Sequence, residues 1–535
     1  MPRAEHSTGE ALVGLLEAYG VDTIFGIPGV HNVEMYRALP RSKINHILTR
    51  HEQGAGFMAD GYARATGKPG ICFTITGPGL TNIMTPIGQA YSDSSSILVI
   101  SSALDISDSA QGRGRLHEMI DQHGAAKAIA SLSMRAYTPK DVQDGVARAF
   151  SNFASARPRP AYLELPLDLL KVPSGEGWTA AGLAGKAVPS DAQIADAKSR
   201  LAAAKNPVIV LGGGALGGGE AALAIAEKLG AIILTTTAGK GVVPEDHPLC
   251  FGYRLASLVG QSLLRQANAI LCAGSELSET DFWDSNVILS KGLIRIDIDP
   301  ASLARPHHAD LAILADAPAS LAKIAASLPE KEHADRRKAN EKRVASMVAA
   351  EEEEEGPLRR TLRKVLAVIR ESLPRETIIA SDMTQIAYAA NEIFPVYEPR
   401  TWLHPVGFGT LGFALPAGIG AKFGCPDKPV AVMIGDYGLQ YTINELGTAA
   451  EHKLPLVILL WNNDALGQIR DDMVNKGIQP NAVTLMNPDF QALAKAYRLN
   501  AEKPASLKAL ATAIAKALKA DGPTLIEMTP RMVDG

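Results

Sequence analysis

The sequence predicts an α/β protein built from three doubly wound parallel-sheet domains. At 535 residues the chain is too long for one hydrophobic core, so two or three domains are expected. Apolar runs with the length and β-branching of buried strands alternate with segments of helical spacing, and such crossovers make consecutive strands parallel. Glycine-rich and acidic stretches interrupt this alternation twice, which divides the chain into three blocks.

The first domain is predicted over residues 1–175. It opens on an amphipathic helix and closes on a strand within residues 160–173, and the Gly-rich residues 174–187 that follow indicate a linker. The central domain is predicted over residues 190–330. Its strands are expected at residues 206–211, 231–235, 269–273 and 293–297.

The third domain is predicted over residues 356–535. The acidic run Glu351–Glu355 lies just before it, behind a charged helix. A run of like charges favours either a solvated helix end or a mobile tether, so we expect no chemistry there.

Composition and charge exclude several classes of protein. The net charge is −4 and the Lys and Arg residues are spread along the chain, which argues against a nucleic-acid partner. The four cysteines lie far apart and form no CxxC, so neither a zinc site nor a disulfide framework is indicated. The first residues lack the pattern of a signal peptide and no run of 18 apolar residues occurs, so we expect a cytoplasmic protein without a membrane partner.

One strand, helix, strand unit in the third block carries two polar side chains. Apolar residues 430–434 lead into Asp436, helical spacing follows over 441–453, and a second apolar run over 454–461 leads into Asn463. The two side chains would meet at the carboxyl edge of a parallel sheet, where open α/β folds bind ligands. With a backbone carbonyl near Ala465 they would suit Mg²⁺. The alternative is a helix-capping Asp and an Asn pair in a turn.

A glutamate in the first block precedes a helix of small residues. The helix expected over residues 54–66 would let other backbone pack closely, and Glu52 at its start would then be buried. A buried carboxyl group could donate a hydrogen bond to a ring nitrogen. Alternatively, Glu52 is an ordinary carboxylate stabilised by the helix dipole. The nearby turn over residues 76–82 could accept a flat ring or simply reverse the chain.

The central block has glycine triplets directly after a strand, at residues 212–214 and 217–219. The GxGxxG spacing can be matched in several ways there, so it is a weak signal for a dinucleotide. No acidic residue closes the second strand, because Thr235, Thr236 and Thr237 stand in that place.

In combination, these motifs resemble the thiamine diphosphate enzymes of the acetohydroxyacid synthase and 2-oxo acid decarboxylase superfamily. RHEQGAGFMADGYARATGKPG, TGPGLTN, GFGTLGFALPAGIGAK, GDYG and the later NN occur in the family's order and span nearly the whole chain. The resemblance implies a pyrimidine-binding domain, a central domain and a diphosphate-binding domain. It also implies a homo-oligomer, either a dimer or a tetramer, whose active sites lie between subunits.

The resemblance assigns roles to residues of both outer domains. Glu52 would hydrogen-bond the aminopyrimidine ring and act as a catalytic residue, Leu411 would hold the cofactor bent, and the Gly409 carbonyl would receive its amino group. Asp436, Asn463 and the Ala465 carbonyl would bind Mg²⁺. The full set of expected cofactor-binding residues is Gly29, Glu52, Thr76, Asn82, Thr384, Gln385, Gly409, Leu411, Gly435, Asp436, Tyr437, Gly438, Asn463, Leu466 and Gly467.

The chain departs from the usual family pattern at several positions. Tyr437 stands where the family normally has a second glycine beside the phosphates, so its side chain must point away. The stretches typical of acetohydroxyacid synthases in the pocket loop and in the flavin-binding centre are missing, so flavin is expected to be absent from the central domain. Leu116-His117-Glu118, SELSETD and QIRDDM resemble instead the branch of 5-guanidino-2-oxopentanoate (2-ketoarginine) decarboxylases.

The expected function is therefore the non-oxidative decarboxylation of a 2-oxo acid, with 5-guanidino-2-oxopentanoate as the favoured substrate. His117 would donate a proton or contact the substrate carboxylate, unless it is a solvent-facing loop residue. Carboxylates near the site would take a cationic tail or are solvated caps. An acetolactate synthase-like carboligase is the alternative, and retention of Glu52 disfavours a non-catalytic paralogue. Further candidates for catalysis or substrate contact are Glu118, Gln468, Ile469 and Asp472.

Overall fold

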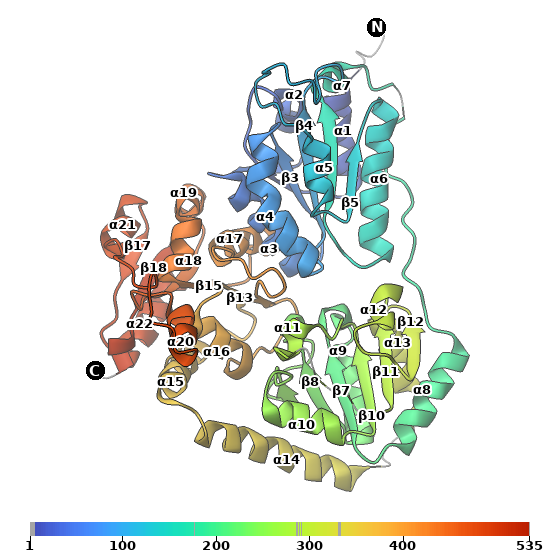
Figure 1. Ribbon diagram of the computed structural model, residues 1–535, viewed down its shortest axis with the longest axis vertical. Coiled ribbons are helices and arrows are strands. Elements are labelled where there is room, and N and C mark those ends of the chain that lie inside the picture. Colours follow the sequence, from blue (N-terminus) through green and yellow to red (C-terminus); the bar gives the residue numbers. More distant parts are fainter. Residues whose placement is uncertain are drawn as a thin grey trace.

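Three six-stranded parallel sheets follow one another along the chain (Figure 1). The computed structural model describes residues 6–175, 177–284, 287, 289, 291–329 and 333–533. The strand orders are β2-β1-β3-β4-β6-β5, β12-β11-β10-β7-β8-β9 and β14-β13-β15-β16-β18-β17. Each order reverses within the sheet, as in doubly wound folds, which confirms the predicted fold class. No helix in the described part of the chain is long and apolar enough to cross a membrane.

The N-terminal unit forms the first sheet, and its central strands β3 and β4 are buried along their whole length. Such strands are apolar on both faces because helices cover both sides of the sheet. The strands are β1 (Thr23–Gly26), β2 (Asn45–Leu48), β3 (Gly70–Thr74), β4 (Ile97–Ala103), β5 (Leu132–Arg135) and β6 (Ala161–Pro166). The helices are α1 (Thr8–Ala18), α2 (Val33–Tyr36), α3 (Glu52–Thr66), α4 (Pro78–Ser92), α5 (Gln122–Lys127), α6 (Pro139–Ser155), α7 (Leu167–Lys171) and the 3₁₀ turn η1 (Leu39–Arg41).

The strand predicted within residues 160–173 is only half correct. The strand ends at Pro166, and the next five residues form α7. Proline has no N–H to continue the ladder, and its φ of −58° suits the start of a helical turn. Leu169 and Leu170 are buried, so the helix contributes apolar side chains to the core.

The central unit forms the second sheet. Its strands are β7 (Pro207–Leu211), β8 (Ile232–Thr235), β9 (Cys250–Gly252), β10 (Ala269–Ala273), β11 (Leu293–Asp297) and β12 (Leu311–Leu314). Its helices are α8 (Asp191–Ala203), α9 (Gly219–Leu229), α10 (Leu258–Gln266), α11 (Glu279–Phe282), α12 (Pro300–Ala304) and α13 (Ala317–Ser327), with 3₁₀ turns η2 (Gly213–Ala215) and η3 (Thr237–Gly239).

The glycines after β7 pack against the turn after β10. The N–H groups of Gly212 and Gly214 donate to the carbonyls of Ala273 and Gly274, both at 2.9 Å. A Cβ atom on Gly212 would lie 2.2 Å from the Gly274 carbonyl oxygen. Because these N–H groups are already bonded within the protein, this turn offers a phosphate little of what a glycine-rich cradle needs.

The helix α14 (Ala334–Glu353) connects the central unit to the C-terminal unit, and the acidic run at its end is not a free tether (Figure 1). Glu355 is only 7% exposed and accepts hydrogen bonds from Arg359 at 3.0 Å and Arg363 at 2.9 Å. Glu351 pairs with Arg254 of the central unit at 2.7 Å. The expectation of a solvated end or tether is therefore wrong for these two residues, because Glu355 is bonded to arginines of α15 and Glu351 to an arginine of the central unit.

The C-terminal unit forms the third sheet. Its strands are β13 (Ile378–Ser381), β14 (Trp402–Leu403), β15 (Val430–Gly435), β16 (Leu456–Trp461), β17 (Asn500–Glu502) and β18 (Thr524–Met528). Its helices are α15 (Pro357–Ser372), α16 (Gln385–Ile393), α17 (Ala414–Gly424), α18 (Asp436–Tyr441), α19 (Leu446–Glu451), α20 (Gly467–Asn475), α21 (Phe490–Ala496) and α22 (Leu507–Ala517), with η4 (Ile443–Glu445) and η5 (Pro530–Val533).

The helix predicted over residues 441–453 is broken into shorter pieces. The chain leaves α18 at Thr442, passes through η4 and resumes as α19. Thr442 has a non-helical φ of −134°, and its hydroxyl donates to the carbonyl of Gly412 at 2.8 Å. That tertiary hydrogen bond competes with helical geometry at a residue of modest helix propensity.

The N-terminal and C-terminal units pack together through α3 and α17, which lie side by side at the centre of Figure 1. A Cβ atom on Gly61 would lie 2.1 Å from the Ala417 carbonyl oxygen, and one on Gly420 would lie 1.9 Å from that of Met58. The two helices therefore approach with backbone against backbone, as the small residues of α3 predict.

Candidate active site

Glu52 is buried at the first position of α3, with 8% of its surface exposed. Its Oε2 atom accepts a hydrogen bond from Asn82 Nδ2 at 2.9 Å. Asn82 lies in α4, which begins just after the turn containing Thr76. Gly29 follows β1, which lies between β2 and β3 in the sheet. The residues expected from the N-terminal unit thus gather at one carboxyl edge of the first sheet.

A second buried glutamate, which the sequence did not single out, supports the backbone before Glu52. Glu445 of the C-terminal unit is fully buried and accepts the N–H groups of Arg50 and His51, both at 3.0 Å. Burial raises the pKa of the Glu445 carboxyl to about 6, although these hydrogen bonds and one from Thr448 oppose the shift. The start of α3 is therefore held by a group from the other outer unit.

His117 lies in the loop after β4, and the structure pairs it with a histidine that sequence reasoning missed. The rings of His117 and His31 meet edge to face with centroids 4.8 Å apart. Their Nδ1 atoms are both buried without a hydrogen-bond partner. His117 has a φ of +65°, a conformation that is costly for a residue with a side chain and tends to occur at functional sites.

Two other carboxylates, Glu118 of this unit and Glu276 in the SELSETD stretch of the central unit, already have partners. Glu118 accepts the N–H groups of Arg113 and Arg115, at 3.1 and 3.0 Å, and thereby closes its own loop. Glu276 of the central unit pairs with Arg157 at 2.5 Å and Arg159 at 3.2 Å. These two carboxylates therefore help to hold a loop and a contact between units.

A small cavity of about 30 Å³ lies behind His117, with room for about one water molecule. Glu164 lines it, and burial raises the pKa of this carboxyl group despite the nearby Arg135. Gln122 also lines it and links Tyr162 to the turn after β3, since Gln122 Oε1 accepts the Gly77 N–H at 2.9 Å. This buried polar network was not apparent from sequence spacing.

The predicted metal residues meet at the carboxyl edge of the third sheet. Asp436 begins α18 directly after β15, and Asn463 lies two residues after β16. Because β15 and β16 are neighbouring parallel strands, both side chains emerge at the same edge. Burial raises the pKa of the Asp436 carboxyl, whereas hydrogen bonds from Asn487 and the Tyr437 N–H lower it.

Thr384 and Gln385 reach this edge from β13, on the other side of β15. Gln385 Oε1 accepts from Asn463 Nδ2 at 3.0 Å. A Cβ atom on Gly435 would lie 2.8 Å from Thr384 Oγ1, and one on Gly467 would lie 2.3 Å from Gln385 Oε1. The two glycines therefore allow these polar groups to crowd together.

The donor set fits a hard dication. The nitrogen of Asn463 faces Gln385, so its oxygen is the atom available to a cation. Asp436 adds a carboxylate, and the peptide of Ala465 lies in the same turn, paired with Thr484. Within the described residues no group of three or more His, Cys, Asp or Glu gathers as it would around zinc. One carboxylate with neutral oxygens is the pattern of Mg²⁺ bound with phosphate.

The ring of Tyr437 is accommodated by α18 itself. It packs edge to face on Tyr441, with centroids 5.3 Å apart. The Tyr437 N–H donates to Asp436 Oδ1 at 2.9 Å. A Cβ atom on Gly438 would lie 2.9 Å from Asp382 Oδ1, so glycine is needed at position 438 for this close approach.

Leu411 is half-buried in the loop that joins β14 to α17. Gly409 in the same loop has a φ of +65°, which glycine adopts readily. Asp382, fully buried after β13, accepts the N–H groups of Gly412 at 3.1 Å and Ala414 at 3.0 Å. Burial raises the pKa of Asp382 to about 6, and these backbone hydrogen bonds oppose the shift.

The N-terminal unit fastens the other side of this loop. Gln89 accepts the hydroxyl of Thr410 at 2.9 Å, and Asp93 accepts the N–H of Gly407 at 2.7 Å. Asp93 is in turn paired with Arg64 at 2.9 Å, within a buried ion pair network. The loop that carries Leu411 is therefore fixed by hydrogen bonds from both outer units.

The last group of candidates lies on α20. Leu466 and Gly467 begin this helix beside Gln385. Gln468 Nε2 donates to Asp472 Oδ1 at 3.0 Å, and the side chain of Ile469 is 47% exposed.

The candidate residues form two groups. The side-chain hydrogen bonds of Glu52 stay within the N-terminal unit and those of Asp436 within the C-terminal unit, so the two groups lie at edges of two different sheets.

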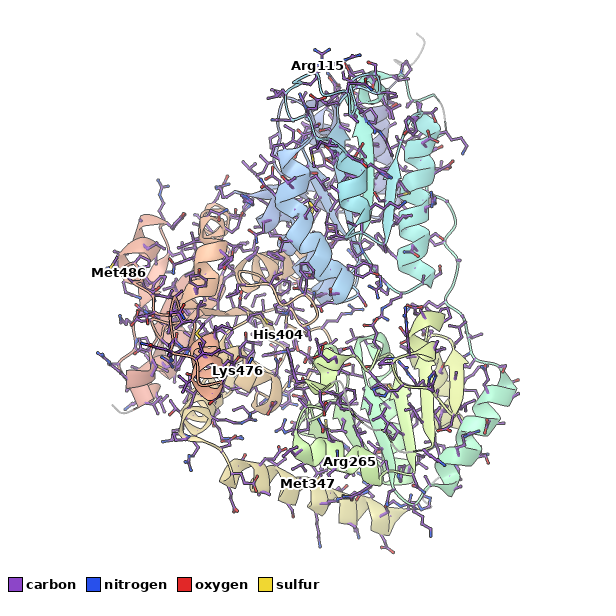
Figure 2. The ribbon with its side chains drawn as sticks, in the orientation of Figure 1. Arg115, Arg265, Met347, His404, Lys476 and Met486 are labelled. Carbon is purple, nitrogen blue, oxygen red and sulfur yellow. The ribbon has the colours of Figure 1, made fainter. Side chains whose placement is uncertain are left out.

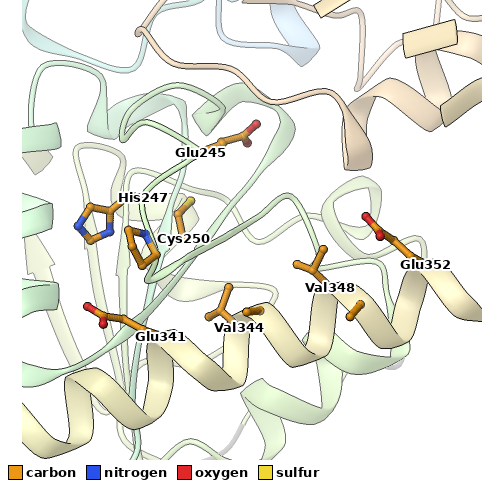
Figure 3. Close-up of a pocket in the computed structure, with 10 residues that line it drawn as sticks. Glu245, His247, Cys250, Glu341, Val344, Val348 and Glu352 are labelled. Carbon is orange, nitrogen blue, oxygen red and sulfur yellow. The ribbon is translucent and has the colours of Figure 1, made fainter. Parts of the chain in front are cut away.

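A pocket of about 450 Å³ lies elsewhere, between the residues before β9 and helix α14 (Figure 3). Its carboxylates are paired, since Glu245 contacts Lys240 at 2.8 Å and Glu341 contacts Arg337 at 2.9 Å. It contains none of the candidate active-site residues.

The three sheets and the polar groups at their edges define a class of protein. Residues 6–125 match the N-terminal TPP binding domain of thiamine pyrophosphate enzymes, residues 194–324 match the central domain, and residues 382–528 match the C-terminal TPP binding domain. The chain belongs to the thiamine pyrophosphate enzyme family, as its motifs predict.

Individual relatives narrow the comparison. "Probable 2-ketoarginine decarboxylase AruI" of Pseudomonas aeruginosa is 46% identical over 98% of this chain and 94% of its own length. "Probable acetolactate synthase large subunit" of Methanocaldococcus jannaschii is 32% identical over 97% of this chain and 91% of its own. "Acetolactate synthase isozyme 1 large subunit" of Escherichia coli is 31% identical over 87% and 83%. Relatives of both kinds are enzymes, and this chain is an enzyme of the same family.

Proposed function

We propose that this protein is a thiamine diphosphate- and Mg²⁺-dependent decarboxylase of a 2-oxo acid, with 5-guanidino-2-oxopentanoate as its substrate. The main support is the 46% identity, over 98% of the chain, to the "Probable 2-ketoarginine decarboxylase AruI", against 30–32% for the acetolactate synthases. The proposal includes domain bounds of 1–175, 190–330 and 356–535 and a cytoplasmic homo-oligomer.

In this proposal, the two sheet edges bind the two ends of the cofactor. Thiamine diphosphate, when bound, supplies the nucleophilic carbon and the electron sink for loss of CO₂. Glu52, oriented by Asn82, hydrogen-bonds the aminopyrimidine ring, and Gly29 and Thr76 line the same edge. Leu411 and the Gly409 carbonyl support the middle of the cofactor.

The opposite end would be held by the residues around Asp436. Asp436, Asn463 and the Ala465 carbonyl would provide oxygen ligands for Mg²⁺, which would neutralise charge of the diphosphate. Thr384 and Gln385 contribute side-chain hydrogen bonds. The backbone at Gly435, Tyr437, Gly438, Leu466 and Gly467 lies beside the phosphates.

The substrate would lie between His117 and α20. His117 contacts the substrate carboxylate or donates a proton, because an imidazole can do either near neutral pH. Gln468 and Ile469 line the acceptor side, and Asp472 and Glu118 are the carboxylates available to a guanidinium tail. In the chain as folded alone, both carboxylates already accept hydrogen bonds, so a substrate would have to share or displace them.

A panel of 2-oxo acids tests the proposal. The purified protein, supplied with thiamine diphosphate and Mg²⁺, is assayed for CO₂ release from 5-guanidino-2-oxopentanoate, pyruvate and branched 2-oxo acids. We expect the highest kcat/KM for the guanidino acid. Turnover of pyruvate to acetolactate, with no activity on the guanidino acid, would instead establish the carboligase alternative, which the 30–32% identical relatives favour.

A further inference from the structure

A short segment, residues 483–487, fastens the turn that follows β16. We call this segment the strap. The N–H of Leu466 donates to the Val483 carbonyl at 2.9 Å, and the N–H of Leu485 donates to the Asp464 carbonyl at 3.0 Å. Ala465 forms an isolated bridge with Thr484 between these two bonds. The strap therefore fixes the peptides on both sides of Ala465.

Asn487 ends the strap and connects the two strand ends that carry the metal ligands. Its Nδ2 atom lies 2.8 Å from Asp436 Oδ2, 3.0 Å from Asn462 Oδ1 and 3.1 Å from Asp464 Oδ1. Asp436 follows β15, whereas the other two acceptors follow β16. A single amide group thus spans both sides of the site.

The orientation of this amide follows from the chemistry around it. Three acceptor oxygens surround Nδ2, which has two hydrogens, so this end must be the nitrogen. The Oδ1 atom accepts from Gln440 Nε2 at 3.2 Å, and Gln440 also donates to the Asp436 carbonyl at 3.1 Å. The donors of Asn487 and Tyr437 thus hold one carboxylate oxygen of Asp436 each.

We propose that Asn487 is the positioning residue of the metal site, and that it orients Asp436 and the Asn462–Ala465 turn for Mg²⁺ bound with the diphosphate. This inference rests on the proposed function, because it assumes that cofactor and metal. Asn487 contacts the expected ligand Asp436 and not the metal. Hydrogen-bonded partners of metal ligands commonly change metal affinity by about 10- to 100-fold when they are removed.

Sequence spacing did not indicate this role, since Asn487 lies 51 residues after Asp436. The neighbouring Met486 is 99% exposed and lies at the outer edge of the C-terminal unit (Figure 2). The strap thus runs near the surface, whereas the Asn487 amide points inward and forms hydrogen bonds with Gln440, Asp436, Asn462 and Asp464.

The test measures Mg²⁺ dependence of cofactor binding with the full-length protein. Mg²⁺ is titrated in the presence of thiamine diphosphate, and binding is followed by quenching of tryptophan fluorescence. Trp461, the last residue of β16, lies next to Asn462 and serves as the reporter. Asn487→Ala removes the amide, and Asn487→Asp keeps its size but replaces the donor with an acceptor. Asn481→Ala is the matched control, because Asn481 is exposed on the same connection and, among the described residues, its side chain bonds only the Gln479 carbonyl.

We expect both Asn487 variants to raise the half-saturating Mg²⁺ concentration by about 10- to 100-fold. Saturating Mg²⁺ should restore their cofactor affinity to near that of wild type, and Asn481→Ala should match wild type throughout. If Asn487→Ala does not fold, the Mg²⁺ dependence of Asn487→Asp alone tests the inference. Wild-type Mg²⁺ dependence in a folded Asn487 variant, or an equal loss in Asn481→Ala, would overturn the inference.

Two further results separate this inference from the proposed function. In the first, wild type binds thiamine diphosphate only with Mg²⁺, but the Asn487 variants lose cofactor affinity equally at all Mg²⁺ concentrations. This result would mean that the strap serves loop folding, and it would overturn this inference alone. A wild-type protein without Mg²⁺-dependent cofactor binding would overturn both.

Discussion

The environment of Glu52 favours a specific chemical role over a surface one. A carboxyl group at a helix start is ordinarily solvated, yet Glu52 is 8% exposed and is oriented by Asn82. Buried acidic groups of this kind suit proton transfer and hydrogen bonding to a ring nitrogen. The amide of Gln in its place could still bond Asn82 but could not exchange a proton.

We therefore expect Glu52→Gln to lower kcat for decarboxylation by about 10²- to 10⁴-fold, the usual contribution of general acid–base catalysis. Thiamine diphosphate binding should change little, because the shape and the contact with Asn82 are retained. Steady-state kinetics and cofactor titration measure the two effects separately. Glu371→Gln, on an exposed face of α15, is the control. An unchanged kcat would contradict the role of Glu52.

The buried Asp382 carboxyl group leads to a prediction about how the stability of the fold depends on pH. Burial raises its pKa from 3.8 to about 6, so the folded state holds this proton more tightly than the unfolded chain does. The unfolded state binds fewer protons between pH 4 and 6, and stability from this group therefore falls as pH rises through that window. The shift of about two pKa units corresponds to roughly 3 kcal/mol.

We expect the free energy of unfolding of wild type, relative to Asp382→Asn, to fall by roughly 3 kcal/mol from pH 4 to pH 7. Urea denaturation of both proteins at several pH values measures this difference. The exposed substitution Asp521→Asn corrects for the loss of one negative charge. If the free energy of unfolding depends on pH in the same way for wild type and Asp382→Asn, the Asp382 carboxyl group has the same pKa in the folded and unfolded states, which would contradict the prediction.

At the scale of elements, the close crossing of α3 and α17 depends on glycine. A Cβ atom on Gly420 would lie 1.9 Å from the Met58 carbonyl oxygen, a distance at which the helices must separate. A Cβ atom on Gly14 in α1 would lie within 4 Å of no described atom beyond its chain neighbours and the nearby backbone of its own helix, so alanine there would mainly reduce the freedom of the unfolded chain.

The two alanine substitutions should thus have opposite effects. Gly420→Ala should destabilise the protein by about 1–3 kcal/mol or more, through overpacking against backbone. Gly14→Ala should stabilise it by about 0.5–1 kcal/mol. Chemical denaturation of both variants measures the change. A stable Gly420→Ala protein would mean that α17 can shift without cost.

The strands could be predicted from the sequence because buried parallel strands are apolar along their whole length. For example, the bounds of β10 and β11 match those expected from the sequence. The position of the candidate metal site could be predicted from the strands, since Asp436 comes directly after β15 and Asn463 lies two residues after β16. The break at Thr442 could not be predicted, because it depends on a hydrogen bond to Gly412. The role of Glu445 could not be predicted for the same reason, since its partner Arg50 is 395 residues away.

At the scale of the whole molecule, the two halves of the proposed site belong to two different sheets. Glu52 lies at the carboxyl edge of the first sheet, and Asp436 lies at that of the third. Contacts between the two units include α3 against α17, Gln89 of α4 against the loop after β14, and Glu445 of η4 against the residues before α3. No hydrogen bond among the described residues joins Glu52 to Asp436. The family resemblance implies active sites between subunits, so we propose that a cofactor contacts Glu52 of one chain and Asp436 of a second copy.

Mixed oligomers test this arrangement. Glu52→Gln and Asp436→Asn homo-oligomers should each be nearly inactive, because each lacks one half of every site. Co-expressed with distinct tags, the two chains should form heterodimers in which one of two sites has both native groups. With random assembly of dimers, half of them are mixed, and about 25% of wild-type activity should return. A purified mixed dimer should reach about 50%. Absence of recovery in purified mixed dimers would place Glu52 and Asp436 of one chain in the same site and would contradict the shared arrangement.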